Sequence, residues 1–139
     1  MRQHDVTTPT VMIVEDFDDT RLAMRQLLEM EGYRVVEAVN GREAIDVARR
    51  ERPALVLMDL NMPVLDGFGA TLRIRELEGF GAVPIVAVTA FDTTEFRAAA
   101  KAVGCGEFIV KPIDFDTLAA LLDKLLKVQS AGMHGGAAH

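Results

Sequence analysis

The sequence has little of what exported, disulfide-bonded or membrane proteins require. A single cysteine, Cys105, excludes an internal disulfide, and such a chain suits a reducing compartment, so we expect a cytoplasmic location. The Gly-Cys-Gly context of Cys105 is typical of a small residue in a turn rather than of a redox group. The N-terminal residues 1–10 contain no apolar segment of a secretory signal. No apolar run is longer than a strand, so no membrane-spanning segment is expected.

Positive charge and histidine are also scarce. The 15 Lys and Arg residues against 21 Asp and Glu residues give a net charge of −6, which argues against binding nucleic acid or an anionic membrane over a large surface. His134 and His139 lie in a segment of Gly and Ala without a hydrophobic pattern, too sparse to suggest a metal site. We expect residues 129–139 to form a disordered tail that is too short for a DNA-binding module, which disfavours direct transcriptional output.

The length and the hydrophobic content of the chain are sufficient for one domain. The chain has 139 residues, of which 50% are hydrophobic, and this length and composition suit a single substantial core. No internal repeat or linker divides it. We expect a flexible N-terminus over residues 1–9 and one domain over residues 10–128.

Apolar runs of strand length alternate with helical patterns along this domain. The run at residues 54–58 is uninterrupted, which fits a strand buried on both faces of a parallel sheet. Such alternation predicts an α/β fold, a doubly wound (βα)5 arrangement with helices on both faces and right-handed crossovers. The five strands are expected at residues 11–14, 33–38, 54–58, 84–88 and 108–110, each followed by a helix.

Polar residues follow four of the five predicted strands. Glu15 and Asp16 end the first, Asp59 the third, Thr89 the fourth and Lys111 the fifth. Each has an ordinary explanation alone: a solvated strand end, a turn or helix cap, or a surface lysine. The carboxyl ends of parallel strands lie at the same edge of the sheet, and ligands bind at this edge in open α/β sheets. If the four strands are neighbours, we therefore expect these side chains to converge there.

The chemistry of such a cluster is specific. Three carboxylates close together repel one another, and the pKa of at least one of them would rise. A divalent cation relieves the repulsion, and oxygen donors without thiolate or histidine favour Mg²⁺ or Mn²⁺ over zinc. With Lys111 as an ammonium and Thr89 as a hydroxyl donor, the set matches an aspartyl-phosphate site in which Asp59 is the nucleophile.

At this point the sequence resembles a known family, the receiver domains of two-component response regulators, over residues 10–127. The resemblance implies a flavodoxin-like sheet with the strand order 2-1-3-4-5. It rests on motifs that occur in the family's order: Val14-Glu-Asp16, Met58-Asp-Leu-Asn-Met-Pro63 with Asp66-Gly67, Val88-Thr-Ala90 and Phe108-Ile-Val-Lys-Pro112.

The resemblance also implies roles. Asp59 would accept a phosphoryl group from a histidine kinase or a phosphotransfer protein. Glu15, Asp16, Asp59 and the backbone carbonyl of Asn61 would hold Mg²⁺. Thr89 and Lys111 would bind the phosphoryl oxygens. The chain would phosphorylate and dephosphorylate itself without turning over a separate substrate.

The same resemblance implies a switch. Phe108 would turn inward as Thr89 moves toward the phosphate, although plain core packing also explains a phenylalanine there. The Lys111–Pro112 peptide bond would be cis. The fourth helix, the fifth strand and the fifth helix would form the face that binds a downstream protein or a second copy. Asn61 and Phe91 occupy positions at which the family tunes dephosphorylation, which leaves the phosphate lifetime open.

Other functions compete with this one. The chain could be a phosphate shuttle or sink in a relay, or a receiver excised from a hybrid kinase. A haloacid-dehalogenase-type phosphatase would have a second acidic residue two positions after its nucleophile, where this sequence has Asn61. A flavin carrier of the same topology would need a phosphate-binding loop after the first strand, where the acidic residues 15–19 would repel the phosphate.

Overall fold

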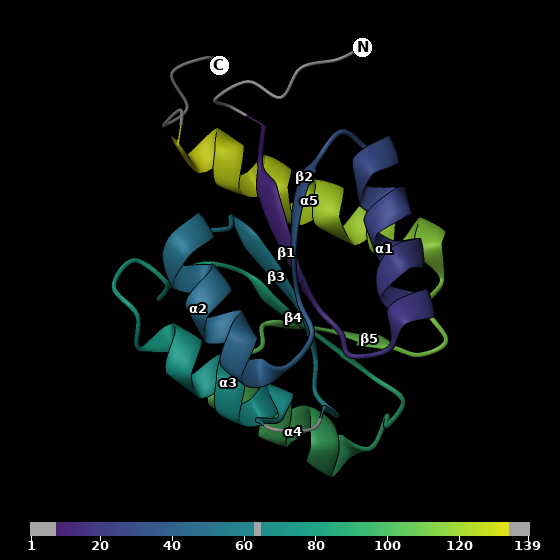
Figure 1. Cartoon of the computed structure of the whole chain (residues 1–139), viewed down its shortest axis with the longest axis vertical. Coiled ribbons are helices and arrows are strands. Elements are labelled where there is room, and N and C mark those ends of the chain that lie inside the picture. The colour runs from purple at the N-terminus through teal and green to yellow at the C-terminus, as the bar shows by residue number, and fades with distance from the viewer. Residues whose placement is uncertain (1–7, 63–64, 134–139) are drawn as a thin grey trace.

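The computed structural model describes residues 8–62 and 65–133. Strands and helices alternate along the whole of this range (Figure 1). None of the helices in the described range is long and apolar enough to cross a membrane. The elements are β1 (Thr10–Val14), α1 (Asp18–Met30), β2 (Arg34–Ala38), α2 (Gly41–Glu51), β3 (Leu55–Asp59), α3 (Gly67–Arg75), β4 (Ile85–Thr89), α4 (Thr94–Val103), β5 (Glu107–Val110) and α5 (Phe115–Met133).

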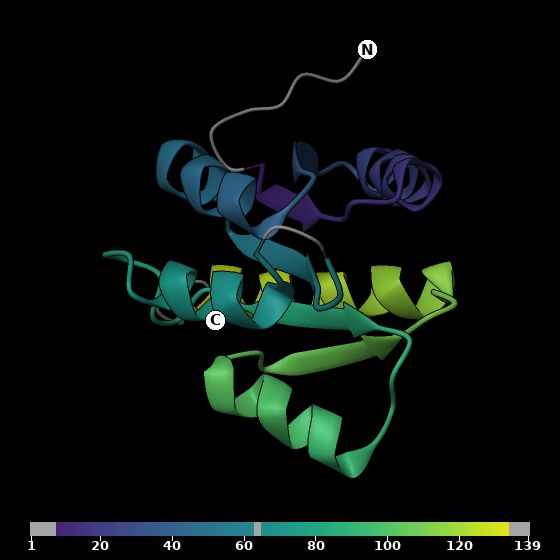
Figure 2. The ribbon, with the colours of Figure 1, turned by 60° about the horizontal axis from the view of Figure 1, so that its bottom comes forward.

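The five strands form one sheet in the order β2-β1-β3-β4-β5. Every neighbouring pair is parallel, so all the carboxyl ends lie along the same edge (Figure 2). The predicted α/β fold and strand order are confirmed. The central position of β3 explains its continuous apolar sequence, because all five of its residues are buried.

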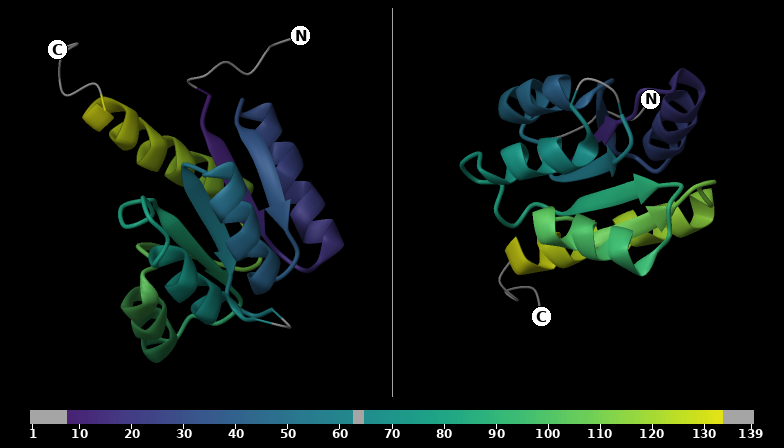
Figure 3. Two further views of the ribbon diagram at one scale, coloured as in Figure 1. Left: turned by 60° about the vertical axis from the view of Figure 1, so that its left-hand side comes forward. Right: turned by 90° about the horizontal axis from the view of Figure 1, so that it is seen from below.

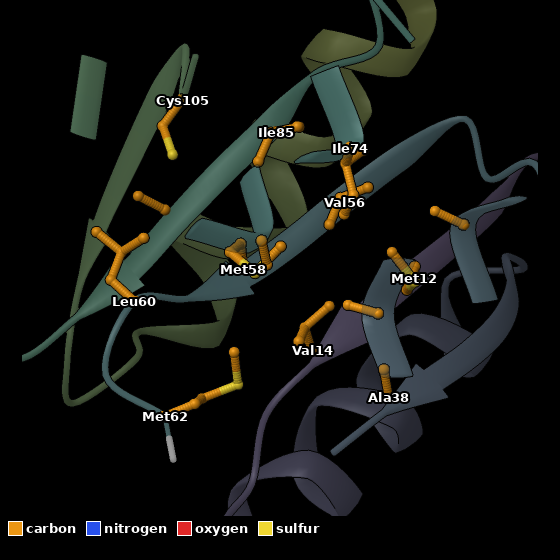
Figure 4. Packing of buried hydrophobic residues seen from close by; sticks show 14 of the residues in the cluster. Met12, Val14, Ala38, Val56, Met58, Leu60, Met62, Ile74, Ile85 and Cys105 are labelled. Atoms are coloured by element: carbon orange, nitrogen blue, oxygen red, sulfur yellow. The ribbon is translucent and has the colours of Figure 1, made fainter. Parts of the chain in front are cut away.

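Helices cover both faces of the sheet (Figure 3). Successive strand residues point to opposite faces, so the strands feed two separate hydrophobic cores. One core packs Met12 and Met58 against α2, α3 and α4, with Ile74 of α3 beside Val56 (Figure 4). The other core packs the strand residues of the opposite face, among them Val11, against α1 and α5.

Side chains fix where several helices begin. Asn40 accepts a hydrogen bond from the Glu43 amide at the start of α2, and Asp66 accepts one from the Gly69 amide at the start of α3. Asp114 does the same for α5. These side chains satisfy amides that have no partner inside the helix. For α4 the capping residue is Thr93.

Some predicted details differ in the structure. Met30, at the end of α1, is 82% exposed despite its apolar side chain, whereas Met24 and Leu28 are buried, because these two are four residues apart and share a face. Helix α5 continues to Met133, five residues past the domain end expected at residue 128, because extending a helix is easier than starting one. The predicted tail beyond residue 133 and residues 1–7 of the N-terminus lie outside the described residues.

Gly67 places the start of α3 directly against the carboxyl end of β3. Its amide donates to the Leu60 carbonyl at 3.3 Å. A Cβ atom at this position would lie 2.6 Å from the Leu60 Cα and closer still to the Asp59 carbonyl oxygen. Only a residue without a side chain fits, so this glycine holds the two elements together behind Asp59.

We expect Gly67→Ala to lower the free energy of unfolding by about 1–3 kcal/mol, because the added methyl group meets backbone atoms that cannot move aside easily. Urea denaturation followed by circular dichroism measures the change. Gly106→Ala is the matched control, since nothing lies within 4 Å of the Cβ it would add. Equal stability of the two variants would contradict the packing argument.

Candidate functional site

The parallel sheet gathers the predicted polar residues at its carboxyl edge. Asp59 is the last residue of β3 and Thr89 the last of β4, while Glu15 directly follows β1 and Lys111 directly follows β5. β1, β3, β4 and β5 are consecutive neighbours in the sheet. The geometric condition on which the predicted site depended is therefore met.

Three acidic side chains form a tight cluster at this edge. Carboxylate oxygens of Glu15, Asp16 and Asp59 all lie within 4.8 Å of one another. Glu15 is 1% and Asp59 2% exposed, whereas Asp16 is exposed to solvent. Two buried carboxylates at such separations repel each other strongly in a low-dielectric environment. The cluster therefore needs a positive charge.

Lys111 supplies part of that charge. Its ammonium nitrogen lies 3.2 Å from Glu15 Oε1 and 3.4 Å from Asp59 Oδ2. Burial by itself would lower the pKa of Lys111, but the negative charges of Asp59 and Glu15 outweigh this effect and raise it. Lys111 is consequently a protonated cation at neutral pH and bridges the two buried acids.

The positive charge of Lys111 balances the negative charge of Glu15 only in part. Burial, followed by the negative charge of Asp59, raises the pKa of Glu15 above its ordinary value of 4.5. Its Oε2 accepts a hydrogen bond from the Phe17 amide at 3.1 Å. Its buried Oε1 accepts none from the described residues, and its neighbour is the ammonium of Lys111 in the ion pair at 3.2 Å. A buried carboxylate oxygen in this state is suited to bind a cation, and the all-oxygen donor set fits Mg²⁺.

The hydroxyl group of Thr89 lies on the other side of Asp59. It donates to the Asn61 side-chain oxygen at 3.4 Å and accepts from the Phe91 amide at 3.1 Å. The backbone N–H of Asn61 in turn donates to Asp59 Oδ1 at 2.9 Å. Asn61 thus links the hydroxyl of Thr89 to the carboxylate of Asp59.

The remaining predicted residues belong to β5 and the segment that directly follows it. The Lys111–Pro112 peptide bond is cis, and the Lys111 amide donates to the Thr89 carbonyl at 2.7 Å. Phe108 is half-buried in β5, on the same face of the sheet as α4.

Two contacts near the site were not predicted from the sequence. The guanidinium of Arg97 lies over the ring of Phe108, and the amide of Phe17 holds the buried Glu15. The second follows from the short loop after β1, but the sequence carries no signal for the first, because it depends on how α4 packs against β5.

Comparisons with known proteins agree with this geometry. The family model described as "Response regulator receiver domain" matches residues 11–123. Protein PilH of Pseudomonas aeruginosa is 33% identical over 116 residues, which cover 84% of this chain and 96% of PilH.

Solved structures are similar as well. Chemotaxis protein CheY4 of Vibrio cholerae has a TM-score of 0.82 at 31% identity, and the match covers 85% of this chain and 98% of that chain. The receiver domain of sensor histidine kinase PA1611 from Pseudomonas aeruginosa has a TM-score of 0.80 at 32% identity, with 86% of this chain and 98% of that chain covered. The latter structure is described as having a magnesium ion coordinated in its active-site cleft.

We expect Glu15→Gln to raise the free energy of unfolding of the metal-free protein at neutral pH by about 1 kcal/mol, since it removes a buried charge that lacks full compensation. The folded-state pKa of Glu15 is raised, so the ionised group opposes folding above its ordinary range. The metal-free wild type should therefore gain stability as the pH falls from neutral toward 4.5, and the variant should lack this gain.

Denaturation in a chelator across this pH range measures both effects, and added Mg²⁺ should stabilise the wild type more than the variant. Glu78→Gln is the control, because Glu78 is exposed in the loop between α3 and β4. A Glu15→Gln protein that is less stable than the wild type without metal would contradict the electrostatic account.

Proposed function

Because the chain belongs to the family of response regulator receiver domains, we propose that Asp59 accepts a phosphoryl group from a histidine kinase or a phosphotransfer protein. The single observation that supports this most is the position of Lys111, within 3.4 Å of both buried carboxylates. A cation, a carboxylate nucleophile and a hydroxyl donor around one point are the components that phosphoryl transfer to a carboxylate requires.

Each residue has a role in the proposed transfer. An oxygen of Asp59 forms the new bond to phosphorus while the bond from phosphorus to the donor's histidine nitrogen breaks. Lys111 turns from the carboxylates toward a phosphoryl oxygen and neutralises part of its charge. Thr89 leaves Asn61 and donates its hydroxyl to another phosphoryl oxygen.

The acidic cluster supplies the metal site in this proposal. Glu15, Asp16, Asp59 and the backbone carbonyl of Asn61 would hold Mg²⁺, with Mn²⁺ as a substitute of similar preference. The ion, when bound, neutralises carboxylate and phosphoryl charge. Glu15 Oε1 supports this assignment, because it is buried, accepts no hydrogen bond from the described residues and shares its one cationic neighbour, Lys111, with Asp59.

The proposed output is a change of surface and not a released product. Thr89 and Phe108 would form the switch, and α4, β5 and α5 would present the altered face to a downstream protein or to a second copy of the chain. The domain would act in the cytoplasm, without direct contact with nucleic acid or membrane. No separate substrate would be turned over.

A role inside a relay is the second candidate. The similar PA1611 domain is described as the receiver of a sensor histidine kinase, so the chain could equally serve as a phosphate shuttle, a sink or a part of a hybrid kinase. Transfer of phosphate onward to a histidine protein, faster than loss to water, would favour the relay. A phosphatase acting on free esters is disfavoured by Asn61.

We predict Mg²⁺-dependent labelling of Asp59 by a small phosphodonor such as acetyl phosphate. Asp59→Asn should abolish it, because the amide is not a nucleophile of comparable strength. Intact-protein mass spectrometry detects the added phosphoryl group. Asp46→Asn is the control, since Asp46 is an exposed acid on α2. Labelling that survives Asp59→Asn would refute the assignment.

Lys111→Met should separate the two functions of the lysine. Labelling should slow by about 10²-fold, because a charge aimed at the phosphoryl oxygens is lost. Mg²⁺ should stabilise this variant more than the wild type, since the ion no longer competes with the ammonium for Glu15 and Asp59. Thermal unfolding with and without Mg²⁺ tests the second effect. Lys124→Met, an exposed position on α5, should change neither quantity.

A further inference from the structure

Two side chains of α4 lie against the ring of Phe108. The guanidinium carbon of Arg97 lies 4.4 Å from the ring centre, and the Phe96 ring meets the same ring edge-on at 6.5 Å between centroids. A guanidinium over an aromatic face is attracted by the electron-rich ring, more strongly where water is partly excluded. Phe108 is half-buried. Its present orientation is therefore stabilised by a cation from α4.

The loop between β4 and α4 fixes the position of this cation. Arg97 Nε donates to Asp92 Oδ1 at 2.5 Å, and the Arg97 amide donates to the Thr93 carbonyl at 3.0 Å. The ion pair is exposed, so it contributes little stability by itself. Its effect is to orient the guanidinium toward the ring. Asp92 thus connects the loop to Phe108 through Arg97.

The same loop holds the hydroxyl of Thr89. The Phe91 amide donates to Thr89 Oγ1 at 3.1 Å, and Phe91 is the neighbour of Asp92 in the chain. Phe91 also packs on Phe96, with ring centroids 5.5 Å apart. A movement of Thr89 toward Asp59 would break the bond to the Phe91 amide and disturb the loop that orients Arg97.

We propose that Arg97 is a positioning residue that holds Phe108 in its half-buried orientation and thereby opposes the movement of Thr89 toward a phosphoryl group on Asp59. This inference rests on the proposed function. Arg97 touches no reacting atom and acts through the aromatic ring. Loss of the guanidinium should favour the phosphorylated arrangement, because that arrangement would no longer require the contact with the ring to break.

The experiment uses beryllofluoride with Mg²⁺ as a stable mimic of the phosphoryl group, and 4-fluorophenylalanine at position 108 as a ¹⁹F NMR probe. For Arg97→Ala we expect the half-saturating beryllofluoride concentration to fall about two- to fivefold, the range that corresponds to one partly exposed cation–π contact. The metal-free ¹⁹F line should move toward the beryllofluoride-bound position. Arg97→Lys, which keeps the charge, should lie between Arg97→Ala and the wild type on both measurements.

Lys101→Ala is the matched control. Lys101 is one turn further along α4 and lines the same groove between α4 and β5, together with Phe108. Its loss changes the net charge by the same amount, so it should leave both measurements as in the wild type. An equal shift in Lys101→Ala would show a long-range charge effect and overturn the proposal.

A double-mutant cycle tests the route through the ring. In a Phe108→Leu background, Arg97→Ala should have no further effect on the half-saturating concentration, because the ring on which Arg97 acts is absent. An effect of unchanged size would overturn the proposal. If the wild type binds beryllofluoride and is labelled at Asp59 but Arg97→Ala behaves identically, this inference alone fails. If the wild type shows neither response, the proposed function fails and this inference with it.

Discussion

One ammonium shared between two buried carboxylates is the interaction on which the site depends. Taking Glu15 and Asp59 out of water costs several kcal/mol for each ion, and an isolated pair of like charges could not remain ionised there. Lys111, at 3.2 and 3.4 Å from them, removes part of this cost. It does not remove all of it, since the pKa of Glu15 stays raised through burial and the charge of Asp59. The resulting deficit of positive charge is what makes the cluster receptive to a cation.

The packing of the fold offsets the electrostatic cost of burying Glu15 and Asp59. β3 is buried along its whole length, and Asp59 at its carboxyl end is 2% exposed. Burying a Leu or Val side chain contributes roughly 1.5–3 kcal/mol, and the two cores on either side of the sheet contain many of them. That apolar burial offsets the electrostatic cost at the edge. Gly67 allows α3 to start against the backbone of Asp59, so the strand end is held rigidly despite the repulsion.

The extent to which the sequence predicts these features follows from how local each one is. The strands and the convergence of Asp59 with Lys111 are predictable, because strand-length apolar runs and parallel topology determine them. The contacts of long side chains are not predictable in this way, because they depend on tertiary packing. Arg75 illustrates this: its guanidinium donates to the carbonyls of Gly104, Phe80 and Val83, and no sequence pattern joins the end of α4 to the loop between α3 and β4. The exposure of Met30 has a related cause, since an apolar residue at a helix end can lie beyond the core.

The two sides of the site differ in how firmly they are held. Toward β1, the strands that lead to Glu15 and Asp59 are buried almost completely. Toward α4, Ala100 is the one residue of the helix that is fully buried, Phe91 is 52% exposed, and the bonds of Thr89 go to Asn61 and to the loop amide of Phe91. Elements with few buried contacts rearrange at lower free-energy cost than core strands. A charge added at Asp59 would therefore act on a rigid β1 side and a compliant α4 side, and the structural response would be concentrated in the loop after β4, in α4 and in the ring of Phe108.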